Sequence, residues 1–473
     1  MRQIIRGWNP TRRRAGSVFL SAAVLFLCIT APERLKAQGV QSPLLSGFNP
    51  AGGSRGLQLY NVTGFAGWES VVSPQGGLYL PNGTDVKGDE MMGGSASAGW
   101  SGHSERASAS IQYTASYIAQ VRYSGLNALS HFLGINATRR LSPKWNVGFS
   151  ASSALSTYNQ LLFSPMVLSE VVAVPATFDD LSSAVLAGQF TNDQLASLLT
   201  GAPLIESPAR TAIFGNRVFA SSASASLGYA HSTRLSINFS ASASLMQHVH
   251  DTHQQDVPQY AYLIPRAIGA TAGMGVSYAL SPKTHVGVEA SSSRGFSTIQ
   301  DSYTTAANGF IGRTFGRRWF AQVHGGGGFV TNIRTHYASS ASTSPVFGGN
   351  LGYKTSAHGF LAEYDRTLGQ TYGAGAAQMT SISAAWNWWQ PGHKWGLNSS
   401  YMRQDFSRAA FAKIQGWRAS FGLTRQLGGH LVIETAYMYG SYTDASAPLS
   451  LYNSAQHAVR LSMMFSPQGR ERR

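Results

Sequence analysis

Strict alternation of apolar and polar residues is the feature that most limits how this chain can fold. From Leu235 to Leu245 every second residue is apolar, and the residues between them are serine or asparagine. Successive side chains of a β-strand point to opposite faces, so this pattern predicts a strand with one apolar and one polar face. The same alternation recurs over 111–117 and 145–152. The chain is therefore expected to be all-β.

The alternating segments are about 10 to 15 residues long, which suits strands that cross a bilayer at a tilt better than the strands of a soluble sandwich. Charged residues make up only 12% of the chain, about half the usual share. Beyond residue 37 there is no apolar run of about 18 residues, which excludes a helical membrane protein. The 10 Trp, 20 Tyr and 23 Phe make disorder equally unexpected.

Short turns alternate with longer polar connections along the chain. Leu141-Ser142-Pro143-Lys144 and Leu280-Ser281-Pro282-Lys283 are near copies, and each is followed by Val-Gly two residues later. Longer connections are expected near 70–90, 161–215, 248–265, 331–344 and 443–454. Short turns at one end and long loops at the other are typical of a transmembrane β-barrel.

Counting strands between these turns gives an antiparallel up-and-down barrel over residues 57–466. Gly64 and Gly67 interrupt the first strand, so 16 strands is the alternative to 18; the sheet must close in either case, because an open edge in lipid leaves backbone groups unpaired. The expected strands are 57–69, 92–101, 106–121, 129–140, 145–160, 216–230, 233–247, 266–280, 284–298, 304–316, 319–332, 345–355, 358–370, 376–389, 395–406, 413–426, 430–443 and 455–466.

Residues 1–37 are expected to be an export signal, because a basic start precedes an apolar stretch, Val18 to Ala31, and a small residue, Ala37, at a cleavage site. Residues 38–56 would then form a short N-terminal periplasmic segment, and 467–473 a C-terminal tail. Cys28 is the only cysteine, so the mature chain can form no disulfide or thiolate site. The positive charge shows no basic cluster interleaved with aromatics, and nucleic-acid binding is not expected.

The last expected strand carries a second, more specific pattern. Its apolar residues alternate with Arg460, Ser462 and Met464 and end on an aromatic ring; they are Val459, Leu461, Met463 and Phe465. This resembles the C-terminal assembly signal of bacterial outer-membrane β-barrels, the porin-like family in particular. The resemblance implies a place in the cell outer membrane and folding by the barrel-assembly machinery. Family members usually end on the aromatic residue, whereas Ser466 to Arg473 follow it here.

Aromatic residues near the expected strand ends suit the girdles that sit at lipid headgroup level. Six tryptophans lie beside short turns, and three tyrosines lie toward the other end; they are Trp145, Trp319, Trp386, Trp388, Trp389, Trp395, Tyr437, Tyr439 and Tyr442.

The inward face is expected to carry small polar residues, which could not fill an 18-stranded barrel, so a water-filled lumen is predicted. A few charges should share that face, either as solvated or paired wall residues or as a selectivity ring. These candidate lumen charges are Glu289, Glu363, Asp365, Arg418, Glu434 and Arg460.

The extracellular loop 161–215 is the most distinctive local segment. Asp179-Asp180 and the capping box Thr191 to Gln194 precede apolar runs, which predicts two short helices. The loop could constrict or plug the pore, cap it from outside, or contain an unrecognised pair of strands.

No catalytic or metal-binding site is expected in this chain. His248, His250, His253 and Asp251 are spaced like metal ligands but lie in a flexible polar loop, and no catalytic grouping emerges. We therefore expect no enzyme, cofactor or metal site, but a passive aqueous channel for small polar solutes that contacts outer-membrane lipid. The alternative is a non-conducting barrel that binds a partner or serves envelope structure through its long loops. Assembly into a homo-oligomer is a further alternative.

Overall fold

The computed structural model describes the strands and most short turns of the chain. The described residues are 56–72, 88–121, 127–157, 217–249, 266–297, 300–316, 318–334, 340–355, 357–371, 375–390, 394–407, 414–428, 430–444 and 454–465. The expected export signal, the segment 38–55, the loop 161–215, the tail 467–473 and the histidines at 250 and 253 lie outside these residues and stay predictions.

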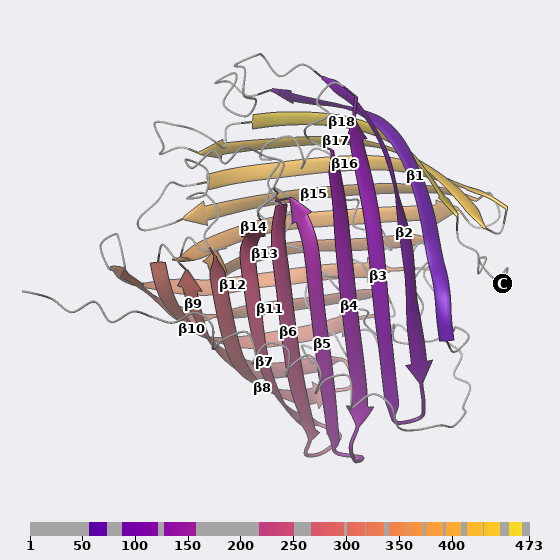
Figure 1. Ribbon diagram of the computed structural model, residues 1–473. Coiled ribbons are helices and arrows are strands. Elements are labelled where there is room, and N and C mark those ends of the chain that lie inside the picture. Colours follow the sequence, from indigo (N-terminus) through magenta and orange to yellow (C-terminus); the bar gives the residue numbers. More distant parts are fainter. Residues whose placement is uncertain are drawn as a thin grey trace, which may run out of the picture.

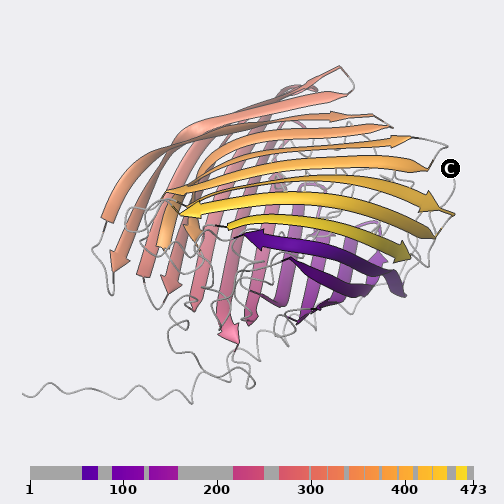
Figure 2. The ribbon, with the colours of Figure 1, turned by 90° about the horizontal axis from the view of Figure 1, so that it is seen from above.

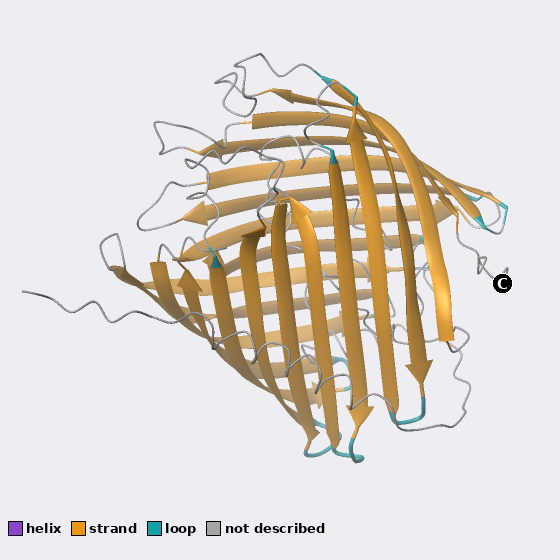
Figure 3. Cartoon of the chain, viewed as in Figure 1, coloured by secondary structure: helices purple, strands orange, loops and turns teal. Residues whose placement is uncertain are grey.

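The described chain forms eighteen antiparallel strands (Figures 1 and 3). They are β1 (Gly56–Val72), β2 (Asp89–His103), β3 (Ala107–Gln120), β4 (Ala128–Arg140), β5 (Trp145–Thr157), β6 (Arg217–Ala230), β7 (Leu235–Val249), β8 (Ala267–Ser281), β9 (Thr284–Ser297), β10 (Gln300–Phe315), β11 (Trp319–Arg334), β12 (Ser340–Lys354), β13 (His358–Thr371), β14 (Gly375–Gln390), β15 (Trp395–Ser407), β16 (Ile414–Leu427), β17 (Leu431–Asp444) and β18 (Ser454–Phe465). Among the described residues there is no helix long and apolar enough to cross a membrane.

The sheet closes on itself (Figure 2). Each strand pairs with its neighbours in sequence, and β1 pairs with β18 from Val62↔Phe465 to Val72↔Ala455. The prediction of 18 strands is confirmed, and the alternative of 16 is wrong. Gly67, which made the first strand uncertain, sits where an added Cβ would collide with the carbonyl oxygen of Val459. Glycine at this position therefore helps the seam to close.

Hydroxyl side chains stabilise several short turns. The Ser142 hydroxyl accepts hydrogen bonds from the backbone N–H groups of Lys144 and Trp145, both at 3.2 Å. In the second copy of the motif, Ser281 accepts the equivalent bond from Lys283 at 3.2 Å, and Ser232 accepts such bonds from Arg234 and Leu235 at 3.2 and 3.1 Å. Serine in such turns satisfies backbone donors that the ladder leaves free. The repeated turn motif of the sequence thus has a direct structural cause.

The prediction of a long loop at 331–344 is wrong, because the connection is much shorter in the structure. Strand β11 runs to Arg334 and β12 begins at Ser340, so only residues 335–339 connect them. Residues 340–344 are Ser, Ala, Ser, Thr and Ser, which lack an apolar face and therefore resemble a loop. Their backbone nevertheless pairs with β11, as in Thr343↔Phe329.

Candidate functional site: the inner wall of the barrel

The outer face of the barrel is apolar and exposed. Large side chains that point away from the barrel axis include Val288, 60% exposed, and Leu461, 53% exposed. They recur at every second position on most strands. A continuous apolar exterior of this kind requires an apolar environment around the protein.

The inner face is lined by small hydroxyl side chains over much of the wall. Serines pair across neighbouring strands, with oxygen–oxygen distances of 2.6 Å for Ser150–Ser224 and 2.9 Å for Ser152–Ser222. On β7, Ser240, Ser242 and Ser244 point inward and are exposed. One strand therefore carries exposed apolar residues on one face and exposed hydroxyls on the other. The inner surface is suited to water.

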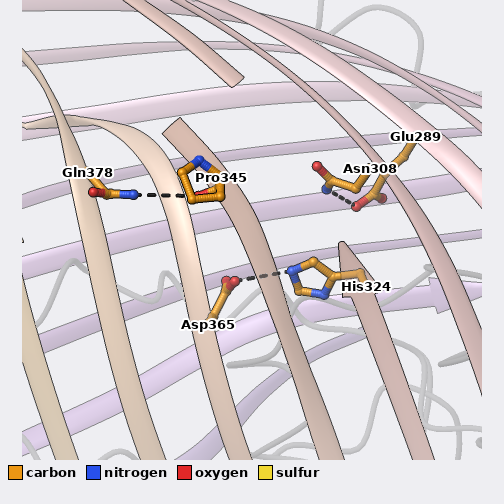
Figure 4. Close-up of polar contacts among 6 residues, drawn as sticks. All are labelled: Glu289, Asn308, His324, Pro345, Asp365 and Gln378. Carbon is orange, nitrogen blue, oxygen red and sulfur yellow. Dashed lines mark hydrogen bonds and ion pairs between the residues drawn. The ribbon is translucent and has the colours of Figure 1, made fainter. Parts of the chain in front are cut away.

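A cluster of charged and polar side chains, which we call the charged sector, interrupts the hydroxyl lining on β9 to β13. Its members are Glu289, Asn308, His324, Glu363 and Asp365, and Figure 4 shows all of them except Glu363. Asn308 Nδ2 donates a hydrogen bond of 2.8 Å to Glu289 Oε1. His324 Nε2 lies 3.3 Å from Asp365 Oδ1. Glu289 and Glu363 are also close enough to His324 to interact with it electrostatically. Asp365 thus contacts the His324 imidazole directly, and two further carboxylates, Glu289 and Glu363, share this part of the inner wall.

Gly348 makes the His324–Asp365 contact possible. These residues lie two strands apart, and Gly348 stands between them in the register. A Cβ on Gly348 would come within 2.8 Å of His324 Cε1 and 2.9 Å of Asp365 Oδ1. Because Gly348 has no side chain, the His324 imidazole and the Asp365 carboxylate can contact each other across the backbone of β12.

All six candidate lumen charges lie on the inner face by strand register. Glu289, Glu363 and Asp365 gather in the charged sector, whereas Glu434, Arg418 and Arg460 lie on β16 to β18. Glu434 accepts a hydrogen bond of 2.9 Å from Asn398 Nδ2, and the Arg460 guanidinium lies 4.4 Å from the centre of the Phe65 ring. The six residues do not form one ring.

Sequence reasoning missed two members of the charged sector, His324 and Asn308. Both belong to the inward polar face of their strands, so the alternation pattern contained their signal. The sequence analysis also assigned Trp389 to the outer aromatic girdle, and that assignment is wrong. Trp389 pairs with Gly396 and shares the inner face with Asn387, while Trp388 points outward.

The loop-side ends of β13 and β14 lie inside the wall. The β12–β13 ladder stops at Phe347↔Arg366, and β14 also lies close to β9, β10 and β11, at least three strands away in the ladder. A Cβ on Gly328, on the inner face of β11, would collide with Leu368 Cδ1. Gln378 Nε2 also donates a weak hydrogen bond of 3.5 Å to the Pro345 carbonyl (Figure 4). This overlap narrows the lumen beside the charged sector.

Gly328 on β11 provides the bare backbone against which Leu368 packs. Nearby on the inner face, Val346 and Val330 are only 2% and 5% exposed. We expect Gly328→Val to destabilise the barrel by about 1–3 kcal/mol, because the new side chain overpacks the contact. Leu368→Ala in the same chain should restore much of that loss, and urea unfolding of the four variants would measure the coupling. Additive effects of the two substitutions would contradict the overlap.

No group of three or more His, Cys, Asp or Glu side chains is placed to hold a metal ion among the described residues. His248 belongs to β7, and its expected partners at 250, 251 and 253 are not described.

No family model matches the sequence, and neither does any curated protein. Three solved structures illustrate the structural comparison. OpdO of Pseudomonas aeruginosa is 11% identical, with 87% of this chain and 98% of that chain covered and a TM-score of 0.41. A BenF-like porin from Pseudomonas fluorescens Pf-5 is 10% identical, with 87% and 98% covered and a TM-score of 0.42. Pseudomonas aeruginosa OccK2 (OpdF), solved in complex with glucuronate, is 8% identical, with 87% and 98% covered and a TM-score of 0.41. Identities this low do not place the chain in a family.

Proposed function

We propose that this chain is an outer-membrane β-barrel that forms a passive aqueous channel for small polar solutes. The two faces of the wall carry the proposal, because exposed apolar residues cover the outside and exposed serines line the inside. A closed sheet satisfies its backbone hydrogen bonds internally, which allows it to span a bilayer. The export signal expected at residues 1–37 and the pattern from Val459 to Phe465 support the outer membrane as its location.

The charged sector is proposed to act on solutes as they pass. Glu289, Glu363 and Asp365 lie beside the overlap of β13 and β14, where a solute would come closest to the wall. Fixed charges at a narrow point select among permeating ions. The proposed channel has no catalytic step, and its partners are lipid, the assembly machinery and the solutes themselves.

Single-channel recording in a planar bilayer tests the proposal. Ser242→Trp places a bulky ring on the inner face of β7, and we expect it to lower the conductance, whereas Ala241→Trp on the outer face should leave it unchanged. Ser242 and Ala241 are adjacent, both exposed and similar in size, so the pair isolates the direction of the side chain. A wild-type barrel that is folded but does not conduct would favour the partner-binding alternative.

A further inference from the structure

The inner face of the barrel carries a repeated basic position at the short-turn end. Of the eight odd-numbered strands from β3 to β17, six begin directly after a lysine or arginine; these residues are Arg106, Lys144, Arg234, Lys283, Arg318 and Lys394. In the remaining two turns the position is held by Ala357 and His430. We call the six residues the turn cations.

The backbone fixes the face on which the turn cations lie. The carbonyl oxygen of each one accepts a hydrogen bond from the backbone N–H of the residue opposite it on the neighbouring strand, at 2.6 to 3.0 Å. These opposite residues continue the inward alternation of their strands; they are Arg140, Ala230, Ala279, Thr314, Lys354 and Gln426. The turn cations therefore occupy inner-face positions around the mouth of the lumen, and all six are exposed.

Two of the opposite residues add further positive charge. Arg140 lies directly opposite Arg106, and Lys354 lies directly opposite Arg318. Like charges placed directly opposite each other destabilise a sheet. Arg106 and Arg140 are both exposed, and guanidinium groups form strong, directed hydrogen bonds to the oxygens of carboxylates and phosphates. An anion between these two arginines would therefore be bound from both sides, and it would relieve their repulsion.

Negative charge is scarce around these eight cations. Among the described residues, the carboxylates nearest to this end are Glu105, in the turn before β3, and Glu434, near the start of β17. Glu434 already accepts a hydrogen bond from Asn398. The carboxylates of the charged sector lie deeper in the lumen. Glu289, for example, is six residues beyond Lys283, which is roughly 20 Å along the strand. The lumen therefore has two separate zones of opposite charge.

We propose that the turn cations, together with Arg140 and Lys354, form a basic mouth that binds solutes with two or more negative charges. From β3 to β11 a turn cation stands at every second strand, about 10 Å from the next, so one such solute can contact two of them. Each added charge on the solute strengthens the attraction, whereas a single charge in a wide, wet mouth is largely screened. Short turns face the periplasm in outer-membrane barrels, so this is the periplasmic mouth. The inference rests on the proposed channel and adds a class of solute to it.

The test measures equilibrium binding of pyranine, a fluorescent dye that carries three sulfonate groups. The fluorescence anisotropy of the dye would be followed while the barrel, folded in an uncharged detergent, is added. We expect the wild-type barrel to bind pyranine at low salt and to release it at high salt, because mobile ions screen the attraction. This measurement needs no current through the lumen.

Two variants with equal loss of charge give the matched control. Arg106→Gln with Arg140→Gln removes the two facing arginines of the basic mouth. Arg313→Gln with Arg425→Gln removes two arginines at the same end of the barrel that point outward, since Arg313 pairs with Ala321 and Arg425 with Trp395 on the outer face. Only the first pair should weaken pyranine binding, about fivefold at low salt. Retained heat-dependent gel mobility would show that both variants fold.

The outcomes separate this inference from the proposed channel. A folded wild-type barrel that does not bind pyranine, or equal losses in the two variants, would overturn the inference. A barrel that binds pyranine as expected but conducts no current would support the basic mouth and contradict the channel. In a conducting barrel, pyranine should reduce the current when it is added to one side of the bilayer only. Equal block from both sides would overturn the placement of the anion site at the mouth.

Discussion

Ala241→Arg is expected to cost about 2–4 kcal/mol of folding free energy in a lipid bilayer, while Ser242→Arg should cost close to nothing. Ala241 faces outward near the centre of β7, and its arginine would have to enter the hydrocarbon. Ser242 faces the lumen, where an arginine stays in water. Urea titrations of refolding into lipid vesicles would measure both values.

The two substituted residues are matched in exposure, size and strand position, and they point in opposite directions. Both residues are exposed, both are small, and both sit opposite small residues, Ala272 for Ala241 and Thr271 for Ser242. Neither change removes packed core volume. Similar costs at the two sites would mean that the strand faces are assigned wrongly, and a larger cost for Ser242→Arg would mean that the barrel is inverted.

A disulfide across the closing seam should stabilise the barrel by up to about 5 kcal/mol, because it joins two ends of a very long loop. Ala66 and Leu461 are direct partners of β1 and β18, and both face outward. The chain has no cysteine beyond Cys28, so Ala66→Cys with Leu461→Cys introduces a single possible pair. Oxidation in detergent and gel mobility with and without reductant would detect the bond.

The control for this experiment moves one cysteine to the other face of β18. Ala66→Cys with Ser462→Cys places the two thiols on opposite sides of the wall, since Ser462 is paired with Phe65 and points inward. This pair should stay reduced. Efficient bonding in the control, or failure of the first pair in a folded barrel, would show that β1 and β18 do not meet in this register.

Most of the wall could be predicted from the sequence, because alternation and turn chemistry act locally. Two examples are the strand that begins at Trp145 and the turn Ser142-Pro143-Lys144. Each residue there has a local preference for strand or turn conformation. Prediction failed at the start of β12, where residues 340–344 are polar on both faces. Their strand conformation depends on pairing with β11, which no local pattern encodes.

The charged sector was predicted only as separate residues. Glu289 and Asp365 are far apart in sequence, and they approach His324 because four successive ladders bring β9 to β13 side by side. The overlap of β13 and β14 was not predicted at all. It depends on the bare backbone at Gly328 and on the point at which β12 and β13 part, and both are tertiary features.

The short β12–β13 ladder makes the wall mechanically uneven. It contains eight register pairs, from Phe347↔Arg366 to Lys354↔Gly359, whereas β10 and β11 share sixteen. Local opening of a closed sheet begins where the fewest hydrogen bonds must break. The barrel is therefore expected to open first between β12 and β13, where the contact of Leu368 with Gly328 and the hydrogen bond of Gln378 to Pro345 hold the ends of β13 and β14 against the wall.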